Sequence, residues 1–363
     1  MGFATALHLT KKGYKVFGLD NFLRRRMVEE VGGQSVFPIE NRYNLWEFQE
    51  GSVMDADTIY EILEKFQPDV IIHFAEQPSA PYSMKSVGHA TFTQMNNVIG
   101  TLNLLWAMKE KCPKAHLIKI GTMGEYSDWI YRGSKIPEGN RVKVIYNNME
   151  IEIPTPKATG SFYHWSKIFD SGNIEFTCKI WGLKATDINQ GVVYGTRIEE
   201  MDDNTRTRFD FDECFGTIIN RFCAQAIIGI PLTIYGLGFQ KRGFINLQNV
   251  VQAIELVIEH PPKEGEFRVV NQLTEVFTLN ELAEIVKETG DKLGLNVQIQ
   301  HILNPRVEKE RHEYFPTFSR LREFGLQPIK LRHAIRGILE DLIPYKSRIE
   351  EKKEAILPKT FWK

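Results

Sequence analysis

Tyr163 and Lys167 are spaced for proton transfer, because residues four positions apart lie on the same face of a helix. They stand in the segment SFYHWSK, which indicates the start of a helix. If this face borders a cleft, the lysine ammonium lowers the pKa of the phenol from its usual ~10. The phenolate can then take a proton from a hydroxyl group while a hydride leaves the same carbon. The same spacing also arises by chance on ordinary amphipathic helices.

Asp20 and Thr122 follow apolar segments that indicate strands, YKVFGL and AHLIKIG. An acidic residue at the carboxyl end of the second strand of a dinucleotide fold can bind both ribose hydroxyls of the adenosine and repel a 2′-phosphate. Asp20 therefore favours NAD over NADP, although the arginines at 24–26 could accept a phosphate and Asp20 could instead cap a turn. Thr122 could hydrogen-bond a substrate hydroxyl or be an ordinary threonine at a strand end.

The elements that would position these residues alternate between helix and strand, which is typical of a parallel sheet with helices on both faces. In the first half, the patterns predict helices at residues 4–13, 55–67, 98–110 and 161–182, strands at 14–20 and 115–122, a buried strand at 69–77, and a segment at 184–195 that begins as a strand and ends in a loop. In the second half they predict helices at 213–229 and 279–294, strands at 266–272 and 296–303, and a charged tail. We expect a Rossmann-type doubly wound α/β domain at 1–194, and a smaller mixed α/β substrate domain at 195–363 that interleaves with it around 242–258.

An insertion at about 128–157 separates Thr122 from Tyr163. Its segment RVKVIYNNMEIEIP alternates apolar and polar residues on both sides of Asn147-Asn148, which predicts a β-hairpin with a tight turn. We expect this hairpin to lie over the mouth of the sheet.

The glycine-rich turn that should precede Asp20 by about twenty residues is missing from the sequence, and only Gly2 could be its last glycine. The first strand is central in the usual strand order 3-2-1-4-5-6. We therefore expect that the first strand lies before Met1 in a longer reading frame.

Composition argues against several classes of protein. Lys and Arg (45) nearly balance Asp and Glu (46), so no global field favours nucleic acid or an anionic membrane. The four cysteines lack Cys-x-x-Cys spacing and the nine histidines form no i, i+4 pair, so we expect reduced thiols and no metal site. No apolar run reaches the ~18 to 20 residues of a membrane span, and no secretion signal begins the chain, which predicts a cytoplasmic protein.

Asp20, Thr122 and the Tyr163-Lys167 pair, in this order and with NVIGTLNLL between the first two, resemble the extended short-chain dehydrogenase/reductase family of nucleotide-sugar epimerases and dehydratases. The segments GVVYG and LTIYGLGFQKRGFINLQNVVQAI extend the resemblance. It implies that NAD transiently oxidises a sugar C4 hydroxyl. HFAEQPSAPYSM, GTMGEY, SFYHWSK and NPRVEKERHEY resemble more closely the members that join UDP-glucose and sulfite into a sulfonated nucleotide sugar.

The resemblance also implies a role for each site residue. Tyr163 would be the base and acid at C4, Lys167 its electrostatic partner and a ribose ligand, and Thr122 the donor to the C4 oxygen. The cofactor contacts would come from Gly2, Asp20, Asn21, Arg24, Asn96, Gln190 and Val193. The UDP-sugar contacts would come from Gln77, Asn189, Thr217, Arg242 and Arg306, with the arginines on the diphosphate.

The implied chemistry needs an acid and a base for elimination as well. Oxidation at C4 acidifies the C5 proton, loss of the C6 hydroxyl gives a 4-keto-5,6-ene, and sulfite adds at C6. Ordinary 4,6-dehydratases follow the threonine with Asp-Glu, whereas this chain has Met123-Gly124 and then Glu125. Glu125 and His164 are therefore the candidates, although His164 lies about 100° around the helix from Tyr163 and could simply be a hydrogen-bonded helix residue.

Other readings stay open. Pro78 stands where members of this group often carry an arginine, so that cation is missing for sulfite or sugar. A UDP-glucose 4-epimerase, a 4,6-dehydratase and a non-catalytic nucleotide-binding scaffold are the alternatives. The family is commonly dimeric or larger, so a homodimer or higher homo-oligomer is expected.

Overall fold

Four parallel strands form the main sheet of the computed structural model, which describes residues 1–39 and 45–362. Their order is β12 (Phe267–Gln272), β8 (Lys184–Gln190), β4 (His116–Thr122) and β3 (Val70–His73). Strands β4 and β8 pair in register up to Thr122 and Gln190, which therefore end side by side at the carboxyl edge. The predicted Rossmann-type α/β fold is confirmed, and Thr122 and Gln190 lie where such sheets bind ligands.

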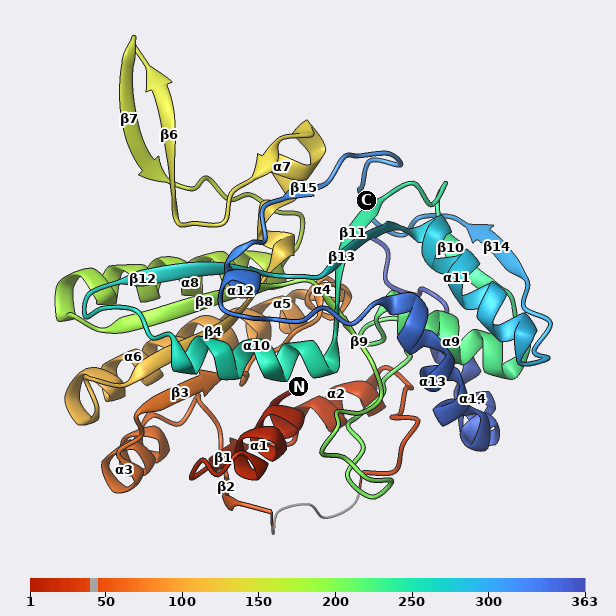
Figure 1. Ribbon diagram of the computed structural model, residues 1–363, viewed down its shortest axis with the longest axis horizontal. Helices are drawn as coiled ribbons and strands as arrows, with labels where there is room; N and C mark the ends of the chain where they lie inside the picture. Colours follow the sequence, from red (N-terminus) through yellow and green to blue (C-terminus); the bar gives the residue numbers. More distant parts are fainter. Residues whose placement is uncertain (40–44, 363) are drawn as a thin grey trace.

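Helices cover both faces of this sheet (Figure 1). Successive residues of a strand point to opposite faces. Leu117 of β4 packs with α6 (Gly100–Lys111) and α8 (Phe162–Trp181), whereas Ile118 and Ile120 pack with α10 (Leu247–Glu259) and α12 (Arg320–Glu323). Because α8 is held by this packing, its first turn is fixed beside the carboxyl end of β4.

A second parallel pair of strands lies apart from the main sheet. Strand β1 (Phe17–Asp20) pairs only with β2 (Glu47–Glu50) in the described part of the chain. The helices near it are α1 (Gly2–Lys11), α2 (Leu23–Glu30) and α3 (Ala56–Phe66). The prediction of a buried strand at 69–77 is wrong in part, because only Val70–His73 is a strand and most of it is half-buried. Its edge opposite β4 borders a cavity, and β1 borders the same cavity.

The second half of the chain builds a smaller region and then returns to the main sheet. Its core packs helices on two parallel strands, and the elements are α9 (Ile218–Ile228), α11 (Leu279–Lys292), α13 (Leu331–Leu342), β10 (Leu232–Tyr235) and β14 (Ile299–Ile302). A mixed three-stranded sheet joins the regions, in the order β13 (Glu275–Thr278), β11 (Lys241–Asn246) and β9 (Val192–Tyr194). The domain limits stay a prediction, and the interleaving extends at least to β12.

The hairpin is confirmed, but its predicted position is wrong. Strands β6 (Arg141–Tyr146) and β7 (Met149–Pro154) pair across Asn147 and Asn148, whose φ angles are 49° and 61°. The ribbon projects from the body of the molecule, and residues 140–158 do not line the cavity (Figure 1). The apolar side chains near its tip remain exposed, so nothing in their packing draws the hairpin over the sheet.

The remaining elements are short. They are α4 (Ala80–Ser83), α5 (Val87–Gln94), η1 (Met95–Ile99), η2 (Met123–Tyr126), α7 (Ser127–Arg132), β5 (Lys135–Ile136), β15 (Phe315–Pro316), η3 (Ile343–Tyr345), α14 (Lys346–Glu351) and η4 (Lys353–Ala355). Within residues 1–39 and 45–362, no helix has both the length and the apolar character of a membrane span.

Candidate active site

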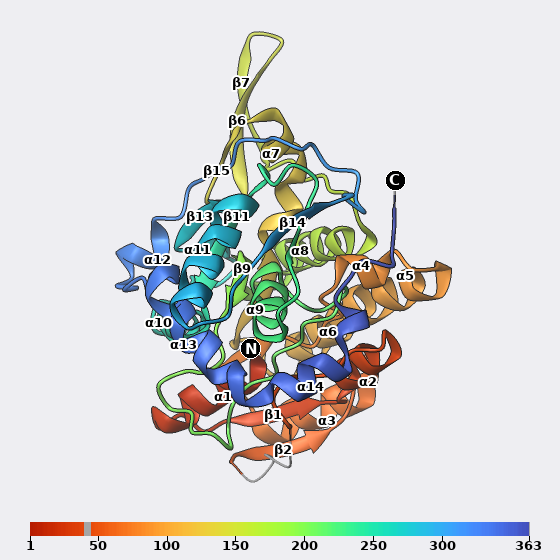
Figure 2. The ribbon, with the colours of Figure 1, turned by 90° about the vertical axis from the view of Figure 1, so that its right-hand side faces the viewer.

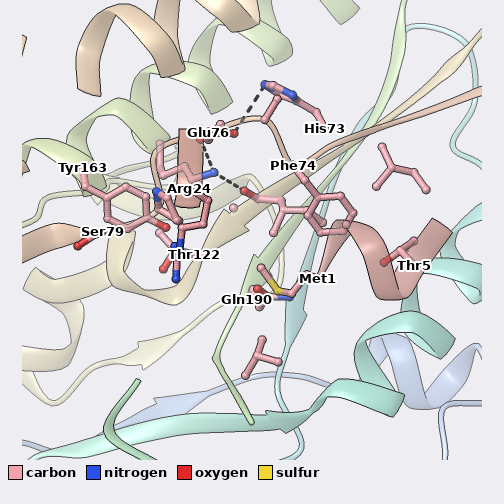
Figure 3. Close-up of a pocket in the computed structure, with 18 of the residues that line it drawn as sticks. Met1, Thr5, Arg24, His73, Phe74, Glu76, Ser79, Thr122, Tyr163 and Gln190 are labelled. Carbon is pink, nitrogen blue, oxygen red and sulfur yellow. Dashed lines mark hydrogen bonds and ion pairs between the residues drawn. The ribbon is translucent and has the colours of Figure 1, made fainter. Parts of the chain in front are cut away.

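A cavity of about 1480 Å³ brings together most of the residues that the sequence singled out. It lies at the carboxyl ends of β1, β4 and β8 and is bordered by the first turn of α8. Figure 3 shows Tyr163 and Thr122 close together on one side, with Gln190 and Met1 across from them. The strand ends and α8 therefore converge on one space, as the sequence predicted.

Tyr163 is anchored at the start of α8. The helix is capped by Ser161, whose Oγ accepts a hydrogen bond from the backbone N–H of His164 at 3.3 Å. The backbone N–H of Tyr163 donates to Oγ of Ser83 at 3.1 Å. Thr122 caps the short helix η2 that follows β4, and its Oγ1 accepts a hydrogen bond from the N–H of Gly124 at 3.1 Å. Both side chains that would contact a C4 hydroxyl are thus held by local backbone capping.

The expected lowering of the Tyr163 pKa is wrong for this structure. Burial raises the pKa of the phenol well above its usual value, and the carboxylate of Glu76 raises it further. Lys167 forms an ion pair with Glu76, donates from Nζ to the carbonyl of Ile120 at 2.5 Å, and lies 6.0 Å from the centre of the Tyr163 ring. The Lys167 ammonium is therefore paired with the Glu76 carboxylate, whose negative charge opposes any lowering of the Tyr163 pKa by the ammonium.

Glu76 is a residue that the sequence analysis missed. It lies three residues after the end of β3 and lines the cavity, and its side chain is 2% exposed. Its Oε1 is 3.8 Å from Nε2 of His73, as the dashed line in Figure 3 marks. A glutamate near the end of the apolar segment DVIIHFAEQ was the available signal, because the carboxyl edge of a parallel sheet is where ligands bind.

His164 lines the cavity with a neutral imidazole. Its Nδ1 lies 2.8 Å from Oγ of Ser161, which fixes the ring. Burial, followed by the charge of Arg306, lowers the pKa of His164 to about 4. A Cβ atom on Gly124 would collide with this imidazole, so the glycine that replaces an acidic residue makes room for the ring. His164 is therefore placed to accept a proton from a ligand in the cavity.

The structure does not bring Glu125 to the cavity. Its carboxylate is fully buried, completes the capping box with Thr122, and lies 2.5 Å from Nζ of Lys157 and 3.6 Å from Nζ of Lys119. Burial acts to raise its pKa, but the two lysines outweigh burial and hold it at about 2. Glu125 is thus a paired anion, and His164 is the elimination candidate that reaches the cavity.

The residues predicted to bind the cofactor all line the cavity. They are Gly2, Asp20, Asn21, Arg24, Asn96, Gln190 and Val193. Asp20 has no ion-pair partner in the described part of the chain, and its Oδ1 accepts from the N–H of Phe22 at 2.7 Å. Gly2 opens the ten-residue helix α1, whose amino end suits a phosphate. A free carboxylate at a strand end beside a helix amino terminus fits the ribose and pyrophosphate of NAD.

Arg24 does not present a free charge to the cavity. Its Nε donates to Asp210 at 3.0 Å, and its guanidinium lies 4.3 Å from the centre of the Phe215 ring. A 2′-phosphate would therefore have to compete with a buried carboxylate, which agrees with the preference for NAD inferred from Asp20.

Of the predicted substrate residues, Thr217, Arg242 and Arg306 line the cavity and Gln77 and Asn189 do not. Gln77 is fully buried, and its Nε2 donates to Thr93 at 2.8 Å. Asn189 is also fully buried and donates to the hydroxyl of Tyr126 at 3.0 Å. Both amides are used in internal hydrogen bonds, because their side chains point into the packed layers.

Two arginines at the end of the cavity that Thr217, Arg242 and Arg306 line lack a carboxylate partner. Arg242 forms an ion pair with Glu308, so its charge is compensated. Arg221 and Arg306 have no ion pair in the described part of the chain, and the Nε atom of each is buried without a hydrogen bond. Burial lowers the pKa of Arg306, the cost expected for a cation without an anion. The pair is therefore a site for an anionic ligand.

Arg221 was missed by the sequence analysis. It is 4% exposed on α9, and its Nη1 donates to the hydroxyl of Tyr235. The signal was a single arginine within the apolar helix segment IINRFCAQAII, because a buried cation needs a partner. The described residues contain no group of His, Cys, Asp and Glu side chains that could hold a metal ion.

The cavity has strand-end contacts for a dinucleotide, a tyrosine at the cleft and buried arginines opposite. These features define an NAD-dependent enzyme of nucleotide sugars, and the comparisons with known proteins agree. The chain belongs to the NAD dependent epimerase/dehydratase family, whose model matches residues 1–271. It is similar to the UDP-sulfoquinovose synthase of Sulfolobus acidocaldarius, at 44% identity over 100% of this chain and 95% of the relative. It is also similar to the chloroplastic UDP-sulfoquinovose synthase of Spinacia oleracea, at 45% identity over 100% of this chain and 77% of the relative.

Solved structures show the same fold. The UDP-glucose 4-epimerase of Thermotoga maritima, solved with UDP-glucose, superposes with a TM-score of 0.68 at 22% identity and 96% coverage of both chains. The family resemblance and the NAD cofactor predicted from the sequence are confirmed by the family match.

Proposed function

We propose that this protein is a UDP-sulfoquinovose synthase, which converts UDP-glucose and sulfite to UDP-sulfoquinovose and water. The observation that carries the proposal is a single cavity lined by Thr122, Tyr163 and His164 at one side and by Arg221 and Arg306 at the other. The similarity to two UDP-sulfoquinovose synthases over the whole chain supports it.

Each part of the cavity has a task in this reaction. Asp20 and Asn21 would bind the adenosine ribose of NAD, Gly2 would lie near the pyrophosphate, and Asn96, Gln190 and Val193 would border the rest of the cofactor. The chemistry that NAD would supply there is acceptance of a hydride from C4 of the glucose and its return at the end of the reaction. Arg221 and Arg306 bind the diphosphate of the UDP-sugar, with Arg242 and Thr217 beside them.

Tyr163 moves the proton of the C4 hydroxyl, and Thr122 orients that hydroxyl. Because its pKa is raised, the phenol is protonated at neutral pH in this structure. It becomes a base only when positive charge outweighs Glu76, and Lys167 is the ammonium placed to do so. In the last step the protonated phenol is the acid for the C4 oxygen.

His164 accepts the C5 proton once C4 carries a ketone and passes this proton to the C6 hydroxyl, which leaves as water. Sulfite adds to C6 of the resulting 4-keto-5,6-ene. The imidazole suits this task, because it is neutral at pH 7 and faces the cavity. When hydrogen sulfite has added through its sulfur atom, the proton that it releases can reach C5 through the imidazole.

Incubation with UDP-glucose, with and without sulfite, tests this function. A sulfonated nucleotide sugar that forms only with sulfite is the expected product, as detected by mass spectrometry. UDP-galactose would instead indicate a 4-epimerase, and a 4-keto-6-deoxy sugar a 4,6-dehydratase. If Tyr163→Phe leaves the biological role of the protein intact, the role is that of a non-catalytic scaffold.

Replacing His164 with Phe is expected to separate oxidation from elimination. Phenylalanine keeps a flat ring over Gly124 but accepts no proton, so sulfonated product should fall at least about 10²-fold. The near-ultraviolet absorbance of reduced cofactor should still rise when UDP-glucose is added. In the unaltered enzyme, the step should slow only as pH falls toward the His164 pKa of about 4. Unchanged product formation in this variant would remove His164 from the mechanism.

We further propose that two copies pair through the outer faces of α6 and α8. Phe169 and Phe176 lie seven residues apart on α8 and are 48% and 59% exposed, and Trp106 of α6 is 45% exposed. The helices pack together, with the rings of Trp106 and Trp181 4.7 Å apart. The stripe suits an isologous helix interface, in which the same surface of each copy meets.

Joint replacement of Phe169 and Phe176 by Glu is expected to halve the molar mass measured by light scattering, because four buried charges would face each other in the pair. Ile145→Glu is the matched control, since Ile145 is 80% exposed at the hairpin tip. A dimer that survives the double change, or one lost in the control, would place the interface elsewhere. The cytoplasmic location stays a prediction.

A further inference from the structure

The chain segment at 359–362 connects the two parts of the molecule that carry the unpaired arginines. After α14 and η4, the chain continues to the end marked C in Figure 2, and Trp362 of this segment lines the cavity. The backbone N–H groups of Lys359 and Thr360 both donate to Oε2 of Glu213, and Thr360 donates from Oγ1 to Oε1 of the same carboxylate at 3.2 Å. Glu213 is 6% exposed, so these bonds are shielded from water.

Glu213 lies just before the helix that carries Arg221. Thr217 is the amino-terminal cap of α9, and Arg221 follows one turn later on the same helix. The N–H of Glu213 also donates to the carbonyl of Ala355 at 2.8 Å. The end of the chain is therefore fastened to the segment that positions Arg221.

The other end of the segment is fastened beside Arg306. The N–H of Trp362 donates to the carbonyl of Pro305 at 3.1 Å, and Trp362 and Arg306 form an isolated parallel bridge. The guanidinium of Arg306 lies 5.3 Å from the centre of the Trp362 ring. Trp362 lines the same cavity as Arg221 and Arg306. An aromatic face at this distance stabilises a cation and keeps water from one side of it.

We propose that residues 359–362 are a strap of the nucleotide-sugar site, which sets the spacing of Arg221 and Arg306 and places the Trp362 ring on the Arg306 guanidinium. Trp362 is thus a positioning residue for the group that binds a nucleoside diphosphate. The inference rests on the proposed function, because it takes the anion between the two arginines to be the diphosphate of a UDP-sugar. It adds an aromatic residue and a chain segment to a site otherwise made of α9 and residues 304–308.

Calorimetric titration of the full-length protein with UDP tests the strap, with retained NAD measured on the same samples. Trp362→Leu and Trp362→Ala should each weaken UDP binding about tenfold, since neither residue offers an aromatic face. Trp362→Phe should bind within about threefold of the unaltered protein, because the ring is kept. Leu357→Ala is the control, since Leu357 is 43% exposed, lies outside the strap and does not line the cavity, and it should not change the affinity.

The kinetic constants give a second readout. Trp362→Leu should raise KM for UDP-glucose and leave kcat within about twofold, because the groups that act at C4 to C6 are not touched. UDP affinity equal to that of the unaltered protein in Trp362→Leu, or a loss confined to kcat, would overturn the inference and leave the proposed function standing. Failure of the unaltered protein to bind UDP would overturn the proposed function itself.

Discussion

Tyr163→Phe is expected to lower kcat by about 10²- to 10⁴-fold, the range that removal of a general acid–base group produces. The phenyl ring keeps its packing, including the contact with the His164 ring at 4.9 Å between centres, so folding and ligand binding should persist. UDP titration and bound NAD should therefore match the unaltered enzyme, while sulfonated product disappears. The loss belongs to the chemical step because only a hydroxyl is removed.

Tyr126→Phe is the matched control for this change. Tyr126 is fully buried near the site, and its hydroxyl accepts from Asn189 at 3.0 Å without lining the cavity. Its loss should reduce activity only a few-fold. If Tyr163→Phe kept more than about a tenth of the activity, or if the control lost as much, the assignment of Tyr163 would be wrong.

Lys119→Met is expected to cause the largest loss of stability, about 3–5 kcal/mol in the free energy of unfolding. Lys119 is fully buried beneath the site, with Nζ 3.4 Å from Asp187 and 3.6 Å from Glu125, and it donates to the carbonyl of Lys167 at 3.0 Å. Burial acts to lower its pKa, but the pull of Asp187 and Glu125 is stronger and raises it. Removing the cation takes from the buried Asp187 its ion-pair partner and leaves the buried Glu125 paired with Lys157 alone among the described residues.

Urea unfolding measures this loss, with Lys143→Met as the control. Lys143 pairs with Glu150 at 2.7 Å on the exposed hairpin, where both side chains are more than half exposed, so its removal should cost less than about 1 kcal/mol. Equal urea midpoints for the two variants would show that the buried ion pairs of Lys119 do not stabilise the protein more than the exposed pair of Lys143 does.

Much of the site could be predicted from local patterns. The order of strand-end residues indicated that Asp20 and Thr122 lie at one cavity, because the carboxyl ends of parallel strands converge on one edge whatever the loops do, whereas Gln190 was named only through the family resemblance. Tyr163 and Lys167 followed from helix periodicity. The hairpin followed from Asn147-Asn148, since a turn with positive φ at two positions favours asparagine.

What could not be predicted depends on contacts between distant parts of the chain. Burial of the phenol, followed by the charge of Glu76, reversed the expected shift of the Tyr163 pKa, and no spacing rule joins Glu76 to Lys167 or to Tyr163. Glu125 was chosen for its place after Thr122, but Lys119 and Lys157 reach it from other elements. The turn of the hairpin determines how its two strands pair, but the direction in which the hairpin projects depends on packing against the rest of the protein.

The most direct test of the account is the fate of deuterium in UDP-[4-²H]glucose incubated with sulfite. Transient oxidation at C4 with return of the same hydride predicts UDP-sulfoquinovose that carries one sulfonate and keeps the deuterium at C4, as read by mass spectrometry and NMR. Deuterium transferred to C6 of an unsulfonated sugar, or deuterated UDP-galactose as the only product, would contradict the account.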